Sequence, residues 1–377
     1  MVKWTAWFER INEMYENELK ALKKAGRFRE RKVYDVTLDD LASNDYLGLS
    51  RNKKQFKKAV KLVEEFTVIS SKASMLVNGY HPIHRIFEKE LAEANSFAEG
   101  MVVGSGFLAN LALIEALVRK GDMLFMDEEY HASGVMASKL LGDRVVTFSH
   151  NDEDDLRVKL EENPAKRQII AVEGIYSMGG DLCKKEIFAL ADEFDTLIIV
   201  DEAHSAGVLG KNLLGIFEYY KIPIRPRHIK MGTLGKAYGS YGAYILASKN
   251  IISFLENRAK PIIYSTAPSV FDTALAQVNF EYIQKNAKEL RKKIAKRQAM
   301  VKSMMNIKMK SLILPVEMES NEFALFMQEG LMKQGYLVGA IRQPTVTTPI
   351  LRVILNLSVP VKKLKHVLAL IRHNTVQ

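Results

Sequence analysis

Cysteine is nearly absent from the sequence, in which Cys183 is the only one among 377 residues. A single thiol cannot form an internal disulfide, so the chain lacks the cross-links of small secreted domains and fits a reducing cytoplasm. The one cysteine and eight scattered histidines give no zinc-binding spacing. We therefore expect a cytoplasmic protein without a metal site.

Long apolar runs are also missing. No segment approaches the ~18 apolar residues that a membrane-spanning helix needs. The N-terminal segment carries acidic residues instead of the apolar stretch of a secretory signal. Hydrophobic residues make up 47% of the chain and charged residues 26%, which is typical of globular domains, and we expect no membrane contact.

Basic residues outnumber acidic ones, 54 to 44, which gives a net charge of +10. This excess either serves solubility alone or attracts an anionic partner such as nucleic acid, a CoA thioester or an acidic carrier protein. The basic residues are dispersed and no basic–aromatic module is present, which argues against a nucleic-acid binder. Such a binder would retain DNA in a salt-sensitive manner and show no visible absorbance.

Helical and strand patterns alternate over residues 51–265. Short apolar runs such as 168–172 and 196–200 are typical of buried parallel strands, and helical stretches such as 107–120 and 184–194 separate runs of this kind. The alternation predicts an α/β domain in which helices cover a mostly parallel sheet.

The two ends of the chain have other patterns. Residues 1–50 form an N-terminal segment in which residues 1–30 predict an amphipathic helix. We expect its apolar stripe to pack on the body of the protein or on a partner subunit. Residues 266–377 predict a smaller α+β domain. The expected elements of that domain are a long charged helix at 269–305, strands near 311–317 and 351–357, and a helix after Pro360.

The first catalytic candidate is Lys236, in the glycine-rich segment 232–239. A lysine that must become a neutral amine and carry a planar cofactor needs a water-poor setting and close backbone approach, which glycine permits. Most lysines in glycine-rich loops are solvated, so this segment indicates a cofactor site only together with a chemical partner elsewhere in the sequence.

Asp201 is that partner. It follows the apolar run 198–200, so we expect it at the carboxyl end of a parallel strand, where open α/β sheets bind ligands. A carboxylate there would keep the ring nitrogen of pyridoxal phosphate protonated. The alternative is that Asp201 caps a following helix. The 35-residue spacing from Asp201 to Lys236 suits one crossover unit between neighbouring strands.

With these two motifs in place, the sequence resembles the α-oxoamine synthases over nearly its whole length. That resemblance implies the α/β fold of the fold-type I PLP-dependent transferases, with a mostly parallel sheet in the large domain and a smaller α+β C-terminal domain. It is carried by ordered blocks at residues 44–48, 104–110, 127–133, 148–152, 173–178, 201–207, 233–236, 264–268 and 339–342.

The resemblance also implies a site for pyridoxal 5'-phosphate. Lys236 would carry the cofactor as a Schiff base, His131 would stack on its ring, and Lys236, His131, Asp201 and His204 would form the catalytic group. Thr266 would reach the phosphate in the partner subunit's site, which implies a homodimer with shared active sites. The residues matched to cofactor binding are Ser105, Gly106, Phe107, His131, Ser177, Asp201, His204, Thr233, Lys236 and Thr266.

For the substrate, the resemblance implies that Arg352 and Asn44 bind the amino-acid carboxylate and that Glu173 lines the site. Segments 73–82 and 341–346 favour the members that join L-alanine to a pimeloyl thioester of CoA or acyl carrier protein. The products would be 8-amino-7-oxononanoate, CO2 and free thiol, in biotin biosynthesis. An arginine near the N-terminus would meet the acyl donor, and Arg27, Arg29 and Arg31 are all open for that role.

Three other functions stay open. The same motifs fit a glycine-using 2-amino-3-ketobutyrate CoA ligase and an enzyme like serine palmitoyltransferase, because the chemistry is shared. A non-catalytic regulator with this fold is the third, and the presence of Lys236, Asp201 and Arg352 together argues against it.

Overall fold

The computed structural model describes residues 14–375. The chain divides into two compact units, Met1–Leu38 and Asp39–Gln377, and each is considered by itself. None of the helices within the described residues combines the length and the apolar character that crossing a membrane requires.

The first unit contains a single described helix, α2 (Glu16–Lys24). The helix predicted over residues 1–30 is therefore wrong at its C-terminal end. It stops early because Gly26 adopts a left-handed backbone with φ of 65°, a conformation that commonly ends helices and that glycine adopts without steric penalty. Tyr15 and Leu19 of the apolar stripe are exposed, and its other members, Trp4, Phe8 and Ile11, lie outside the described residues.

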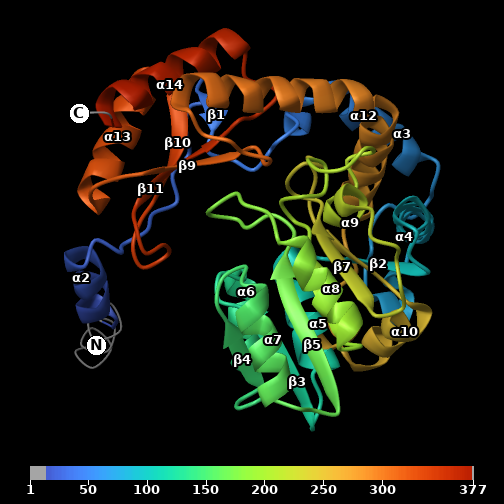
Figure 1. Ribbon diagram of the computed structural model, residues 1–377. Coiled ribbons are helices and arrows are strands. Elements are labelled where there is room, and N and C mark those ends of the chain that lie inside the picture. Colours follow the sequence, from blue (N-terminus) through green and yellow to red (C-terminus); the bar gives the residue numbers. More distant parts are fainter. Residues whose placement is uncertain (1–13, 376–377) are drawn as a thin grey trace, which may run out of the picture. The chain divides into compact units, whose positions relative to one another are not determined.

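The second unit is built around a seven-stranded sheet with the spatial order β2-β8-β7-β6-β5-β3-β4 (Figure 1). Only β8 runs antiparallel to its neighbours, which confirms the predicted mostly parallel sheet. The strands are β2 (Glu99–Val103), β3 (Asp122–Asp127), β4 (Val145–Phe148), β5 (Arg167–Glu173), β6 (Leu197–Asp201), β7 (His228–Thr233) and β8 (Ala243–Ala247).

Helices cover both faces of this sheet, which explains why its central strands are continuous apolar runs. Residues 169–172 of β5 and 198–200 of β6 are fully buried. The helices predicted at 107–120 and 184–194 are confirmed as α5 and α8. The helices of this region are α3 (Lys53–Glu64), α4 (Pro82–Asn95), α5 (Gly106–Leu117), α6 (Ala132–Ser138), α7 (Glu153–Glu162), α8 (Lys185–Glu193), α9 (Ile216–Tyr220), α10 (Lys249–Arg258) and α11 (Lys260–Ile263), with short turns of helix at Leu49–Arg51 and Met75–Gly79.

A smaller four-stranded sheet has the order β1-β10-β11-β9. Its strands are β1 (Asp39–Leu41), β9 (Ile313–Glu317), β10 (Tyr336–Ile341) and β11 (Ile350–Ile354), and its helices are α13 (Asn321–Lys333) and α14 (Val361–Thr375). The predicted strands near 311–317 and 351–357 and the helix after Pro360 are confirmed. The strand β1, which comes from the N-terminal segment, is an edge strand of this sheet. The domain boundaries at residues 50 and 265 stay a prediction.

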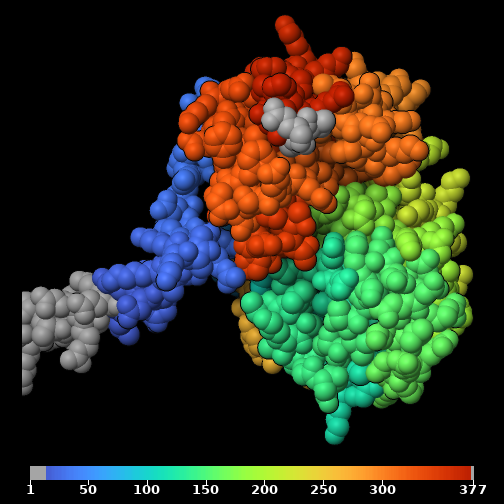
Figure 2. Space-filling model, turned by 60° about the vertical axis from the view of Figure 1, so that its left-hand side comes forward, coloured from blue at the N-terminus to red at the C-terminus, as the bar shows by residue number. Residues whose placement is uncertain are grey.

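The long helix α12 (Val270–Met305) links the two sheets, as predicted for residues 269–305. The Ser269 hydroxyl accepts from Asp272 N and caps the first turn. This helix packs against α3 and α4 near one end and α14 near the other (Figure 1). Figure 2 shows the orange-to-red C-terminal part bordering the green β3–α8 part. The ends of β5, β6 and β7 and the strand β11 supply the residues described next.

Candidate active site

Lys236 lies in the loop that follows β7, three residues after that strand ends at Thr233. Its Nζ is 2.7 Å from Nε2 of His204. Burial lowers the pKa of Lys236 to about 8, although the nearby carboxylates of Asp201 and Glu173 oppose that shift. A larger fraction of this amine is therefore neutral near pH 8 than for an exposed lysine, as a nucleophile or a base requires.

Asp201 is the last residue of β6 and is buried. The backbone of β6 pairs in parallel with β5 on one side and β7 on the other, which brings Glu173 and the Lys236 loop beside it. This confirms the predicted crossover between β6 and β7. Oδ1 of Asp201 accepts from Ala203 N at 2.9 Å. The helix-capping alternative is wrong, because the next described helix begins only at Ile216.

Asn110 was not singled out from the sequence, yet it joins two predicted site residues. Its Nδ2 donates to Oδ2 of Asp201 and to Oγ of Ser133, at 2.9 Å in each case. Its Oδ1 accepts from the Tyr130 hydroxyl at 2.7 Å, and Ser133 Oγ lies 2.7 Å from Nδ1 of His131. One buried amide thus fixes the orientation of the Asp201 carboxylate and, through Ser133, that of the His131 ring.

Tyr46 was also missed. Its hydroxyl makes a short hydrogen bond with Nδ1 of His204, whose other ring nitrogen faces Lys236. His204 is buried, and burial together with the positive charges of Lys236 and Arg352 keeps the pKa of this imidazole well below its ordinary value. His204 is therefore a neutral ring that Tyr46 holds in place.

Glu173, at the end of β5, is buried, and its Oε1 has no hydrogen-bond partner among the described residues. Burial and the neighbouring Asp201 carboxylate raise its pKa well above the ordinary value, and Lys236 opposes the shift. A buried oxygen without a partner is costly, so it is a place where a bound molecule would supply a hydrogen-bond donor.

Arg352 reaches the same region from β11 of the smaller sheet. Its Nε donates to the Ser177 carbonyl at 2.7 Å, and its Nη1 donates to Asn44 Oδ1 at 2.9 Å. Arg352 is buried, and its charge lowers the pKa of both Lys236 and His204. Arg352 and Asn44, the two residues predicted to bind the substrate carboxylate, are therefore in direct contact, and the backbone of Ser177, predicted to bind the cofactor, also contacts Arg352.

The predicted phosphate turn stands at the N-terminus of α5. Ser105 caps this helix, accepting from Leu108 N at 3.2 Å, and Gly106 and Phe107 are its first two residues. A Cβ on Gly106 would lie 3.9 Å from Cβ of Thr233, so the turn and the end of β7 are adjacent. The first N–H groups of a helix have no intrahelical partner and favour anions.

Thr266 is not brought to this group. In the described chain, Thr266 is exposed, pairs with Ser74 through a single bridge, and makes no hydrogen bond to the other predicted residues. Arg27, Arg29 and Arg31 belong to the first unit.

The residues that are present fit pyridoxal phosphate. The amine of Lys236, with its lowered pKa, suits the aldehyde of that group. The buried carboxylate of Asp201 suits the ring nitrogen, and the N-terminus of α5 beside Thr233 suits the phosphate. The unpartnered Oε1 of Glu173 is consistent with a ligand that completes the site.

Comparison with known proteins gives the same family. The model of aminotransferase class I and II matches residues 37–371. An 8-amino-7-oxononanoate synthase of Helicobacter pylori is 45% identical over 346 residues, which span 91% of this chain and 93% of that protein. The synthase of Geotalea daltonii is 36% identical over 356 residues, spanning 89% and 90% of the two chains.

Solved structures agree in fold. Serine palmitoyltransferase from S. paucimobilis, with bound PLP and myriocin, superposes with a TM-score of 0.85 at 22% identity, covering 96% of this chain and 97% of that one. An 8-amino-7-oxononanoate synthase from Francisella tularensis gives 0.76 at 25% identity, covering 90% and 98%. The chain belongs to the aminotransferase class I and II family, within its branch of α-oxoamine synthases.

Proposed function

We propose that this chain is a PLP-dependent acyltransferase that condenses L-alanine with a pimeloyl thioester and releases 8-amino-7-oxononanoate, CO2 and free thiol, a step of biotin biosynthesis. The observation that carries the proposal is that Arg352, which bonds Asn44, belongs to the same cluster of interacting groups as Lys236 and Asp201. The likeness to synthases of this name, at 45% identity over 91% of the chain, supports the choice of substrates.

Bound pyridoxal phosphate would supply an electron-withdrawing ring conjugated to the nitrogen of the amino acid, which acidifies its Cα–H bond. Asp201 would keep the ring nitrogen protonated, and Asn110 aligns that carboxylate. His131 would lie against the ring. N–H groups of the 105–107 turn and the Thr233 hydroxyl would hold the phosphate.

Arg352 would grip the alanine carboxylate with its planar guanidinium, beside the Asn44 amide. A fixed carboxylate sets the direction of the Cα–H bond relative to the Lys236 amine. Lys236 would take the Cα proton, because its lowered pKa leaves a larger fraction of neutral amine near pH 8 than an exposed lysine has.

The bonds then change in a fixed order. Cα of alanine forms a carbon–carbon bond with the thioester carbonyl carbon, and the carbon–sulfur bond breaks to release the thiolate. The Cα–carboxylate bond breaks to release CO2, and Lys236 would return a proton to the same carbon. Neutral His204, held by Tyr46, is placed to donate or accept a hydrogen bond beside Lys236.

We also propose a homodimer, in which Thr266 of each chain serves the site of its partner, and cytoplasmic residence, supported by the single, buried Cys183. The net charge of +10 is consistent with a polyanionic acyl donor, either CoA or acyl carrier protein.

The test is a panel of substrates on protein loaded with pyridoxal phosphate. L-Alanine, glycine and L-serine are each combined with pimeloyl-CoA, pimeloyl carrier protein, acetyl-CoA and palmitoyl-CoA, while free thiol and CO2 are measured. We expect equal amounts of thiol and CO2 with L-alanine and a pimeloyl donor. Preferred turnover of glycine with acetyl-CoA, or of L-serine with palmitoyl-CoA, would overturn the substrate assignment and leave the cofactor assignment intact.

A further inference from the structure

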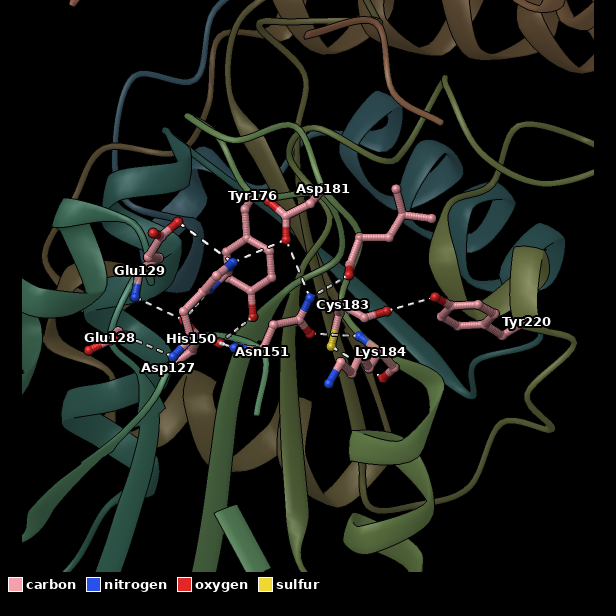
Figure 3. Close-up of polar contacts among 11 residues, drawn as sticks. Asp127, Glu128, Glu129, His150, Asn151, Tyr176, Asp181, Cys183, Lys184 and Tyr220 are labelled. Carbon is pink, nitrogen blue, oxygen red and sulfur yellow. Dashed lines mark hydrogen bonds and ion pairs between the residues drawn. The ribbon is translucent and has the colours of Figure 1, made fainter. Parts of the chain in front are cut away.

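His150 joins three segments of the chain through carboxylates (Figure 3). It lies in the loop between β4 and α7. Its Nδ1 is 3.0 Å from Oδ1 of Asp127, at the end of β3. Its Nε2 is 3.1 Å from Oδ2 of Asp181, in the loop between β5 and α8. Glu129 Oε2 lies 3.7 Å from the same Nε2, and the Tyr176 ring meets the imidazole edge-on with centroids 4.3 Å apart.

The geometry fixes the protonation state of this imidazole. Ionised carboxylates only accept hydrogen bonds, so a ring with Asp127 on one nitrogen and Asp181 on the other must donate from both. Burial lowers the pKa of His150, but the hydrogen bonds and charges of Asp127 and Asp181 outweigh that effect and raise the pKa to about 10. His150 is thus a cation that holds two carboxylates together.

Asp127 links His150 to the segment that bears His131. Its Oδ1 also accepts from Glu129 N at 2.8 Å, and its Oδ2 accepts from Asn151 N at 2.8 Å and from the Tyr176 hydroxyl at 2.7 Å. Asp127 is buried with both oxygens occupied. These bonds therefore fix the position of Asp127, from which the chain continues directly to His131.

Asp181 links His150 to the loop that supports Arg352. Its carbonyl accepts from Tyr176 N at 3.0 Å, and Tyr176 O accepts from Gly180 N at 2.9 Å, which closes a tight loop around Ser177. The Ser177 carbonyl accepts from Arg352. Gly180, with φ of 72°, lies so close to the backbone of Ile313 in β9 that a Cβ would clash at 2.7 Å. The loop is thus wedged against the smaller sheet that carries Arg352.

We infer that His150 is a positioning residue for amino-acid binding, because it clamps the loop under Arg352 to the segment that bears His131. The clamp sets where the carboxylate-binding guanidinium lies relative to the ring-facing imidazole. This inference rests on the proposed function, in which Arg352 binds the amino-acid carboxylate.

The test measures amino-acid binding without turnover. The dissociation constant of L-alanine is taken from the change in visible absorbance of protein loaded with pyridoxal phosphate, for wild type, His150→Gln, Asp181→Asn and the double variant. Partners that orient a functional residue typically contribute about 10- to 100-fold, so each single variant should weaken L-alanine binding about ten-fold. The double variant should be no weaker than the weaker-binding single variant, because both break one clamp.

Asp181→Asn guards against misfolding, because the Asp181 side chain is 42% exposed. His366→Gln is the matched control: its Nδ1 bonds the Tyr336 hydroxyl in the smaller sheet, away from this network. Affinity for pyridoxal phosphate should change little in all variants. An unchanged L-alanine constant in both single variants, or equal loss of cofactor and L-alanine binding, would overturn the clamp. If wild type responds to glycine and not to L-alanine, the substrate proposal fails, and glycine becomes the probe.

Discussion

Nζ of Lys236 and Nε2 of His204 lie 2.7 Å apart, within hydrogen-bonding distance. Two protonated cations would repel at this separation, so at most one of the pair carries a positive charge. Burial lowers the pKa of both groups, and that of His204 falls well below its ordinary value. Since the Tyr46 hydroxyl bonds the other nitrogen of His204, the neutral imidazole is fixed in orientation and keeps Lys236 in place.

The first prediction concerns the pH at which Lys236 captures pyridoxal phosphate. The reactive form is the neutral amine, and a depressed pKa means that this form grows as pH rises through about 8 and saturates above it. An ordinary lysine would need pH values above ~10. The rate at which visible absorbance appears when cofactor is added to the apo-protein should therefore be half-maximal near pH 8 and level off about one pH unit higher.

N-α-Acetyl-lysine in the same buffers is the reference for this measurement, because it combines the ionisations of the cofactor with an ε-amine of ordinary pKa. A capture rate that follows the reference upward to pH 10 would show that Lys236 has an ordinary pKa.

The second prediction is that Lys236→Ala abolishes the visible absorbance of lysine-bound cofactor and reduces turnover at least ~1,000-fold. The expectation follows from the loss of both the covalent anchor and the proton-transferring group, each of which contributes orders of magnitude to rate. Absorbance spectra and thiol release of the purified variant check it. Retained turnover would assign the reaction to another residue. Lys230→Met is unsuitable as a control, because Lys230 is buried against Glu202.

Lys249→Ala serves as the control instead, because this exposed lysine begins α10 outside the site network. It should keep the absorbance and turnover of wild type.

The third prediction concerns Asn110, whose loss leaves Asp201, Ser133 and Tyr130 each without one buried partner. Unsatisfied buried groups cost about 1–3 kcal/mol each. Asp201 and Ser133 keep other hydrogen bonds, so Asn110→Ala should lower the free energy of unfolding by about 1–3 kcal/mol, the cost of leaving the Tyr130 hydroxyl unsatisfied, and release pyridoxal phosphate faster. Denaturant unfolding and cofactor dilution measure the two effects. Asn257→Ala is the control, since the Asn257 amide donates to Ser253 O within α10; equal effects of the two changes would remove Asn110 from the site.

Lys236 and Asp201 were predictable because strand periodicity places their segments at one edge of a parallel sheet. The long helix α12 was predictable because its pattern persists without glycine or proline from residue 270 to residue 305. By contrast, Gly26 ends the first helix by a backbone conformation that apolar spacing does not report.

Asn110, Tyr46 and His150 could not be assigned roles because their partners come from distant segments. Asn110 bonds Asp201 across 91 positions, and Tyr46 meets His204 across 158. One signal was available: Asn110 is the single amide within the apolar residues 107–114, and a buried amide in such a helix needs a partner. Which partner it finds is decided by strand order, which the sequence pattern leaves open.

The last prediction separates substrate binding from cofactor binding at Arg352. Hydrogen bonds to a charged group contribute about 1.5–3 kcal/mol, which corresponds to roughly 10- to 100-fold in binding. Arg352→Gln should therefore raise the L-alanine KM roughly 10- to 100-fold, whereas pyridoxal phosphate binding should change far less. Arg352→Lys should recover only part of the loss, because an ammonium lacks the planar fork that matches a carboxylate.

A second readout checks that Arg352 lies where the contacts place it. The Arg352 charge lowers the pKa of Lys236, so Arg352→Gln should shift the pH midpoint of cofactor capture upward, and Arg352→Lys should not. Arg372→Gln, an exposed arginine near the end of α14, is the matched control for both measurements. Equal loss of L-alanine and cofactor binding in Arg352→Gln, with an unmoved midpoint, would mean that Arg352 supports the fold and does not bind the substrate carboxylate.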